Sequence, residues 1–281
     1  MEEAKPSKTA FGVACHRAAH QILEQQKIFD DPMALKIIGK ETASRLALPV
    51  EQGGRASHPG MRAHMVMRSR FAEDTLAKSY ATGTRQYVVL GAGLDTFAYR
   101  NPFADLRVFE VDHPATQAWK LERLRAGGIA IPANVTHVPV NFEHDSLEAK
   151  MREAGFDLHA RTFFAWLGVV PYLTESAFLE TIGFIARMPQ GSGVVFDYGL
   201  TRDKLSPMEQ MRSDALAARV AHAGEAFKLF FDPVELEAIL MRTGFSHIED
   251  LGRDELNPRY FADRTDGFQL LGSGRIVSAS T

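Results

Sequence analysis

A short apolar run that breaks into a glycine-containing turn is the stretch of this sequence best suited to bind a ligand. It lies in residues 85–100, RQYVVLGAGLDTFAYR, and its pattern predicts a strand, a turn and a helix. Gly91 and Gly93 stand where a buried strand must reverse direction and where the backbone must approach a ligand, and a side chain would obstruct both tasks. The stretch therefore predicts a site for a nucleotide-type cofactor.

An acidic residue ends the next predicted strand, residues 106–112, LRVFEVD. Asp112 follows Gly91 by about 20 residues, a spacing that places its carboxylate at the carboxyl end of the neighbouring strand. There it can accept hydrogen bonds from a ribose diol. The alternative is a plain N-cap for the helix that opens at His113 and Pro114. The pairing with the glycine turn favours the ribose role.

The turn departs from a dinucleotide fingerprint at Thr96, where G-x-G-x-x-G requires a third glycine. Without that glycine the pyrophosphate of NAD lacks its closely packed helix. S-adenosylmethionine has a ribose that needs the acid but no phosphate to seat. The sequence therefore favours a methyl donor, with an NAD-dependent oxidoreductase as the alternative.

Several side chains are candidates for a general base or for the wall of an acceptor pocket. They are His113, Tyr172, Asp197, Tyr198 and His222. Each also has a structural interpretation, as a helix entry, a core aromatic, a strand-end cap or a surface histidine. Tyr172 and Tyr198 follow the fourth and fifth predicted strands, where an acceptor must lie, so we expect them to line the pocket. A carboxylate acceptor is ionised at neutral pH and needs no base, whereas a phenol or alcohol usually needs one.

The rest of the chain alternates apolar strands with helical stretches, which predicts an α/β fold with a mostly parallel sheet and helices on both faces. Further strands are expected at residues 135–140, 162–167, 193–198, 244–251 and 267–271. Helices are expected at residues 9–27, 61–80, 113–125, 178–188, 205–223 and 232–242, with another capped by Asp30, Asp31 and Pro32. Ligands of such sheets bind at the carboxyl ends of the strands.

Residues 48–60, LPVEQGGRASHPG, interrupt the helical pattern near the start of the chain. They show little periodicity and several Pro and Gly signals, which predict a mobile loop. Loops of this length are often lids over a site, and the alternative is a simple connection.

Composition limits the partners and the compartment. The chain has 281 residues, 45% of them hydrophobic, which fits a single domain of residues 1–281. Its net charge is −3 with no basic block, so we expect neither nucleic acid nor a membrane as partner. Cys15 is the single cysteine, and no signal peptide or long apolar run is evident, so we expect a soluble, cytoplasmic protein.

Two histidines, His16 and His20, stand four apart on the first predicted helix, a spacing that can bind a metal. No acidic partner follows them in the HExxH manner, so we expect no metal site. The sequence leaves the oligomeric state open.

Four motifs in order and separation resemble the leucine carboxyl methyltransferase family, particularly its bacterial branch of small-molecule O-methyltransferases. They are VVLGAGLDTFAYR, VFEVDHP, FFAWLGVVPYLT and VVFDY, within a match over roughly residues 9–272. The resemblance implies a Rossmann-like class I methyltransferase fold, in which one of seven strands is antiparallel. It also implies a helical extension and lid (1–80), a donor-binding core (81–200), a helical insertion (201–243) and closing strands (244–281).

The resemblance also implies roles for individual residues. The donor-binding glycines fall on Gly91 and Gly93, and the ribose acid falls on Asp112. The arginine that holds the donor's carboxylate falls on Arg68, with Arg70 as the alternative, because a guanidinium matches a carboxylate in two hydrogen bonds.

This sequence departs from the family pattern at two places. Asn141 and Phe142 replace an Asp-Leu pair that contacts adenine, and Asn can still accept from an amino group. A glutamate near the donor's ammonium is replaced around Trp166, which leaves backbone carbonyls to hold that group and weakens the likeness to protein-methylating members. The expected function is O-methylation of a small carboxylic acid or polyketide-like phenol, with a non-catalytic donor-binding protein as a further alternative.

Overall fold

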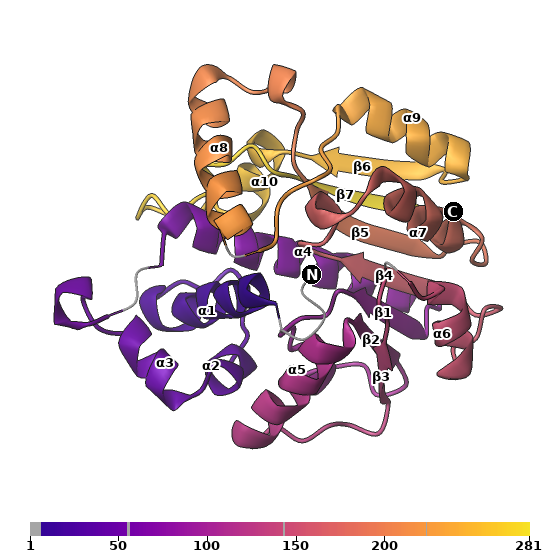
Figure 1. The fold of residues 1–281 in the computed structure, drawn as a ribbon, viewed down its shortest axis with the longest axis horizontal. Coiled ribbons are helices and arrows are strands. Elements are labelled where there is room, and N and C mark those ends of the chain that lie inside the picture. The colour runs from indigo at the N-terminus through magenta and orange to yellow at the C-terminus, as the bar shows by residue number, and fades with distance from the viewer. Residues whose placement is uncertain (1–6, 55–56, 143, 223) are drawn as a thin grey trace.

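A twisted sheet forms the centre of the molecule (Figure 1). The computed structural model describes residues 7–54, 57–142, 144–222 and 224–281, and within them the sheet has the strand order β3-β2-β1-β4-β5-β7-β6. Every neighbouring pair is parallel except those that include β7, which is antiparallel to β5 and to β6. The predicted mostly parallel sheet is confirmed. Its strands are β1 (Gln86–Leu90), β2 (Arg107–Asp112), β3 (Val135–Pro139), β4 (Thr162–Trp166), β5 (Gly193–Tyr198), β6 (His247–Leu251) and β7 (Arg275–Ser280).

Helices cover both faces of the sheet, because successive residues of each apolar strand point to opposite sides. Tyr87 and Val89 of β1 pack in one core, and Val88 and Leu90 pack in the other. The first core is covered by α1 (Lys8–Leu23), α2 (Met33–Ile38), α3 (Lys40–Leu46), α4 (Pro59–Ala81), α5 (Pro114–Ala126) and α10 (Arg253–Tyr260). The second is covered by α6 (Leu147–Glu153), α7 (Glu175–Ala186) and α9 (Pro233–Thr243).

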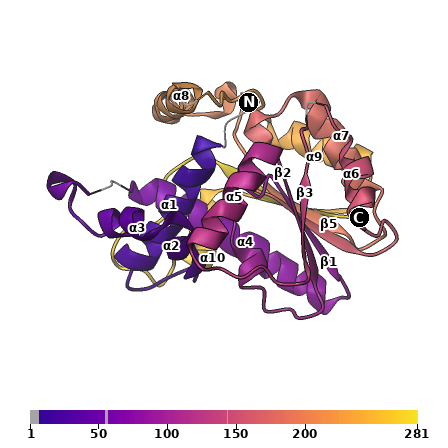
Figure 2. The ribbon, with the colours of Figure 1, turned by 60° about the horizontal axis from the view of Figure 1, so that its bottom comes forward.

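One helix, α8 (Pro207–His222), stands apart from both layers (Figure 2). Val220 is the only buried residue of this helix, all of which the structure describes. The helix lies within residues 201–243, where the family resemblance implies a helical insertion.

The helical extension before β1 is confirmed. Its helix α4 carries Arg68, the residue expected to bind the donor's carboxylate. The predicted 61–80 helix is α4, and the predicted 9–27 helix is the shorter α1. The side chain of Asp31 accepts from the Ala34 N–H at 3.2 Å, which caps α2 as expected. In the 48–60 loop the chain forms one short 3-10 turn, η1 (Val50–Gln52), and residues 55 and 56 lie outside the described residues.

The helix predicted directly after the glycine turn is wrong. Only one 3-10 turn forms there, η2 (Phe97–Tyr99). The side chain of Asp95 accepts from the Phe97 N–H at 2.8 Å and holds the turn. Pro102 follows soon after, and a proline both disfavours helical backbone at the residue before it and supplies no N–H. The chain therefore returns to β2 without an α-helix.

The strand predicted at residues 267–271 is also wrong. The backbone of Leu270 is paired with a side chain instead of a strand, because Asn257 donates to its carbonyl at 3.2 Å and accepts from its N–H at 2.9 Å. Phe268 and Leu270 are buried in the first core, which explains the apolar pattern. The closing strand is β7, and α10 was not predicted from the sequence, in which Pro258 lies inside that helix.

Among the described residues, no helix combines the length and apolar character needed to cross a membrane.

Candidate functional site

The glycine turn is tightly packed at the carboxyl end of β1. Gly91 and Gly93 have φ angles of 64° and 47°, in the left-handed region that favours glycine. A Cβ on Gly91 would lie 2.3 Å from Val169 Cγ2, and one on Gly93 would lie 3.1 Å from Ala10 Cβ. The turn therefore lies between the loop after β4 and the start of α1, with no room for larger residues.

Asp112 ends β2 and binds the glycine turn directly. One carboxylate oxygen accepts from the Gly93 N–H at 2.5 Å, and the other accepts from the His113 N–H at 2.6 Å. Burial raises the pKa of Asp112 to about 6, although both N–H groups and nearby Lys120 act to lower it. The side chain is still partly exposed at the strand edge. Each oxygen retains acceptor capacity, so the carboxylate can receive the two hydroxyls of a ribose.

On the other side of β1, Arg68 of α4 reaches the ends of β4 and β5. Its Nη1 donates to Asp197 Oδ2 at 2.8 Å, and both residues are buried. Asp197 Oδ1 accepts from the Gly168 N–H at 2.5 Å. Burial alone would raise the pKa of Asp197, but Arg68, His64 and the Gly168 N–H together hold it below its usual range.

Gly168 lets the guanidinium approach this strand end. Its φ is 70°, and a Cβ there would lie 2.8 Å from both terminal nitrogens of Arg68. Any larger residue would therefore displace Arg68. Among the described residues, the guanidinium of Arg68 makes hydrogen bonds only through Nη1. Its other N–H groups can therefore donate to the carboxylate of a ligand.

The alternative arginine points elsewhere. Arg70 is exposed and pairs with Asp74 on its own helix at 2.8 Å, and it also donates to the carbonyl of Ile28. Of the two arginines considered for the donor's carboxylate, Arg68 is the one at the carboxyl edge of the sheet.

Asn141 and Phe142, expected near the adenine, lie after the end of β3, and Trp166, expected near the donor's ammonium, does not present its side chain at the strand ends. Asn141 follows β3, where its N–H donates to the Asp145 carboxylate at 2.8 Å, and Phe142 is packed partly against the second core. Trp166 is fully buried and stacks on Phe178 of α7 at 5.6 Å between ring centroids. A contact between Trp166 and the donor would have to come from its backbone. These donor roles stay predictions.

The candidates for a base occupy different surroundings. The ring of His113 caps α5 by accepting from the Ala115 N–H at 3.3 Å, and His222 is exposed at the end of α8. Tyr198 is buried and donates to Asp250 at 2.6 Å, and burial raises its pKa. Tyr172, in the turn η3 (Val170–Tyr172), is half-buried, and burial raises its pKa to about 12.

His64 is a further residue at this edge, and no sequence motif pointed to it. It lies one turn before Arg68 on α4, and its Nε2 is 3.6 Å from Asp197 Oδ2. Its side chain is 24% exposed, so it borders open space. The spacing of four residues that places both side chains on one helix face was the available signal.

The first turn of α1 closes over the glycine turn. Glu225, from the segment after α8, accepts from Ser7 Oγ at 3.2 Å, from the Lys8 N–H at 3.0 Å and from Thr9 Oγ1. Arg17 of the same helix donates to the carbonyl of Leu94 at 2.5 Å. Helix α1 is thus tied both to the insertion and to the glycine turn.

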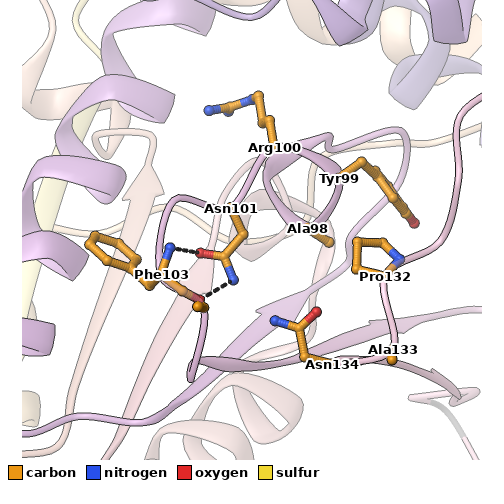
Figure 3. A pocket seen from close by; sticks show the side chains of 9 residues that line it. Ala98, Tyr99, Arg100, Asn101, Phe103, Pro132, Ala133 and Asn134 are labelled. Carbon is orange, nitrogen blue, oxygen red and sulfur yellow. Dashed lines mark hydrogen bonds between the residues drawn. The ribbon is translucent and has the colours of Figure 1, made fainter.

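A surface pocket of about 370 Å³ lies away from this edge, between η2 and the loops that precede β2 and β3 (Figure 3). Asn101 borders it and folds back onto Phe103, accepting from its N–H and donating to its carbonyl. In the part of the chain that the structure describes, no group of three or more His, Cys, Asp or Glu side chains is arranged to bind a metal.

A sequence model of the leucine carboxyl methyltransferase family matches residues 10–186, more than half of the 281 residues. The chain belongs to this family. It is similar to the "Putative S-adenosyl-L-methionine-dependent methyltransferase YktD" of Bacillus subtilis (strain 168), with 31% identity over 99% of each chain. It is also 36% identical to a Mycobacteroides abscessus protein described as a "Putative S-adenosyl-L-methionine-dependent methyltransferase", over 60% of this chain and 56% of the relative.

Solved structures support the same fold. A crystal structure described as "a putative methyltransferase from Thermobifida fusca YX" has a TM-score of 0.58 at 15% identity, over 100% of this chain and 96% of that chain. A DUF574 family protein from Streptomyces avermitilis MA-4680 has a TM-score of 0.55 at 16% identity, over 95% of this chain and 96% of that chain. The chain has the Rossmann-like class I methyltransferase fold.

The residues at the carboxyl edge fit S-adenosylmethionine, the methyl donor that the relatives' descriptions name. A carboxylate for a ribose and a guanidinium for a carboxylate lie on opposite sides of the glycine turn, which suits a donor with those groups at its two ends. NAD fits less well, because the residues described between β1 and β2 form only η2, so no α-helix begins directly after the turn to bind a pyrophosphate.

Proposed function

We propose that this protein is an S-adenosylmethionine-dependent O-methyltransferase that acts on a small-molecule acceptor, either a carboxylic acid or a phenol. Family membership and the named relatives make it a methyltransferase with S-adenosylmethionine as cofactor. The observation that carries the proposal is the placement of Asp112 and Arg68 on either side of the packed glycine turn. In this proposal Asp112 accepts the ribose hydroxyls and Arg68 binds the carboxylate of the donor.

The cover over the strand ends supports a small acceptor. Lys228 and Leu229 both donate backbone N–H groups to the carbonyl of Pro171, at 2.7 and 3.2 Å, so this segment runs across η3. The ring of Phe227 lies 5.2 Å from that of Tyr172. The start of α1 is held to the same segment through Glu225. A small molecule suits a site covered from these two sides better than a folded protein does.

The cofactor supplies an activated methyl group, and the protein's task is to hold the acceptor in line with it and to exclude water. Arg68 and Asp112 fix the donor at two points. The tight contacts of Gly91 and Gly93 keep the turn rigid between β4 and α1, which limits the positions that the donor can take.

The test is the transfer of labelled methyl from S-adenosylmethionine to a panel of small acids and phenols, followed by mass spectrometry of the products. We expect an O-methylated product from at least one class. Calorimetric titrations with S-adenosylmethionine, its demethylated product and NAD complete the test. Binding of NAD but not of the methyl donor would support an oxidoreductase. Donor binding without transfer to any acceptor would favour a non-catalytic binding protein.

A further inference from the structure

A histidine and an aspartate meet at the edge of the sheet where the acceptor must lie. His64 comes from α4 and Asp197 from the end of β5, and their side chains approach to 3.6 Å between Nε2 and Oδ2. The proposed donor runs from Asp112 at the end of β2 to Arg68, so we expect its acceptor on the far side of Arg68, beside the end of β5. Asp197 belongs to β5, and the side chain of His64 beside it is 24% exposed, so the pair lies at the part of the edge where we expect the acceptor.

Two hydrogen bonds fix the carboxylate of Asp197, so that it can orient the ring of His64. Its Oδ1 accepts from the Gly168 N–H, and its Oδ2 accepts from Arg68 Nη1. Neighbouring charge keeps the carboxylate ionised. A fixed carboxylate beside one nitrogen of an imidazole can orient the ring. In the described residues Nδ1 of His64 makes no hydrogen bond, so this nitrogen can accept a proton from a bound molecule. The 3.6 Å between His64 Nε2 and Asp197 Oδ2 is longer than a hydrogen bond, and contacts between catalytic side chains are often longer before the substrate binds.

Aromatic rings stand near the same strand end. Phe227 packs against Tyr172, and its ring lies 6.1 Å from that of Phe230. Phe230 in turn comes within 2.9 Å of a Cβ placed on Gly199, which follows Asp197 by two residues. Aromatic side chains prefer to pack against another ring in stacked or edge-to-face geometry. The rings of Tyr172, Phe227 and Phe230 therefore favour a planar, aromatic acceptor.

We propose that the acceptor of the methyl group is a phenolic hydroxyl, and that His64, oriented by Asp197, takes its proton. This inference rests on the proposed O-methyltransferase function. The acceptor oxygen forms a bond to the methyl carbon while the carbon–sulfur bond of the donor breaks and its electron pair stays on sulfur. The hydroxyl proton passes to His64 and then to water. His64 is thus a catalytic residue, and Asp197 is a positioning residue.

The experiment compares wild-type protein with His64→Gln, which keeps a polar side chain but cannot act as the base. The acceptors are a simple phenol, 4-nitrophenol and a matched benzoic acid, at a pH of about 8. Only the simple phenol is largely protonated there, since phenols have a pKa of about 10. His159→Gln is the matched control, because His159 is exposed and precedes β4, at the amino edge of the sheet.

We expect His64→Gln to lower kcat on the simple phenol by about 100-fold or more, the usual contribution of a general base. Transfer to 4-nitrophenol should change by less than about threefold, because an ionised acceptor needs no base. The Kd for S-adenosylmethionine should stay the same, which shows that the variant is folded. His159→Gln should match the wild-type protein on both phenols.

Several results would overturn the inference. If wild-type protein methylates the benzoic acid but not the phenols, the O-methyltransferase function holds and the phenol assignment fails. If His64→Gln keeps wild-type kcat on the simple phenol, His64 is not the base. If wild-type protein methylates neither class, the proposed function fails as well.

Should the variant not fold, the pH dependence of the wild-type rate decides. A rate for the simple phenol that levels off well below the phenol's own pKa of about 10 supports the base, and a rate that keeps rising toward that pKa contradicts it.

Discussion

Asp112 shows how a single carboxylate can both shape a site and bind a ligand. Its oxygens hold the Gly93 and His113 N–H groups, so it fixes the glycine turn against the end of β2. The same oxygens are the proposed acceptors for the ribose. Because burial raises the pKa of Asp112 to about 6, its charge is lost within an accessible pH range.

Donor binding should therefore weaken in mild acid. The ionised carboxylate accepts the ribose hydroxyls, and a carboxyl group with a pKa of about 6 is only about one-tenth ionised at pH 5. We expect the Kd for S-adenosylmethionine to rise about tenfold between pH 7 and pH 5. Asp112→Asn should bind weakly and with no such dependence, and Asp112→Ala should abolish binding in a folded protein. Calorimetric titration measures all three, and a pH-independent wild-type Kd would contradict the ribose role.

At the residue scale, the sequence predicts best what neighbours in the chain determine. The positive φ angles of Gly91 and Gly93 follow from their place in one turn. The pairing of His64 with Asp197 joins residues far apart in the chain and depends on how α4 crosses β5, which no local pattern contains. Trp166 illustrates the same limit, because alternation along β4 directs its ring toward α7, away from the strand-end site.

At the scale of elements, the first turn of α1 is the part of the site that can control access to it. Ala10 lies directly over Gly93, and the N-terminus of α1 is bound by the carboxylate of Glu225. A negative charge at a helix N-terminus is favourable because it interacts with the helix dipole and with free N–H groups. This contact links the helical extension to the insertion after α8.

Removal of the Glu225 carboxylate should loosen this cover. We expect Glu225→Ala to speed the release of S-adenosylmethionine about tenfold, since charge-assisted hydrogen bonds contribute roughly 1.5–3 kcal/mol. Glu237→Ala on α9 is the matched control, because Glu237 is exposed. Stopped-flow fluorescence measures the release. An unchanged release rate in Glu225→Ala would show that α1 does not cover the bound donor.

Element types were predictable wherever a strong period and a cap coincide, as at α9 with its N-cap Asp232. They were not predictable where tertiary contacts replace regular structure. Asn257 pairs with the backbone of Leu270, so a buried apolar stretch forms no strand. Likewise the turn after Gly93 is held by contacts of Asp31 with Thr96 and Arg100, which come from another part of the chain.

At the scale of the whole molecule, the helical extension and the segment before β7 hold each other in place. Arg62 and Arg264 both pair with Glu24, and both guanidinium groups lie over the ring of Phe268. His20 of α1 stacks on the same ring at 5.7 Å. Burial and the neighbouring arginines lower the pKa of His20 to about 4.

This histidine should make folding stability depend on pH. His20 stays neutral in the folded state down to about pH 4 but gains a proton near pH 6.5 in the unfolded chain. Its contribution is therefore present above pH 6.5 and is lost as the pH falls toward 4, by roughly 2 kcal/mol at pH 5. Urea unfolding at pH 7 and pH 5 measures this loss. We expect His20→Gln to show a loss smaller by about that amount, and equal losses in both proteins would contradict the assignment.

The central claim is that a methyl donor spans the carboxyl edge of the sheet between Asp112 and Arg68. A crystal structure with the demethylated donor, S-adenosylhomocysteine, tests it most directly. We predict that the ribose hydroxyls lie within hydrogen-bond distance of Asp112 and that the amino-acid carboxylate contacts the guanidinium of Arg68. A ligand bound at this edge with its ribose away from Asp112, or bound elsewhere in the molecule, would contradict the claim.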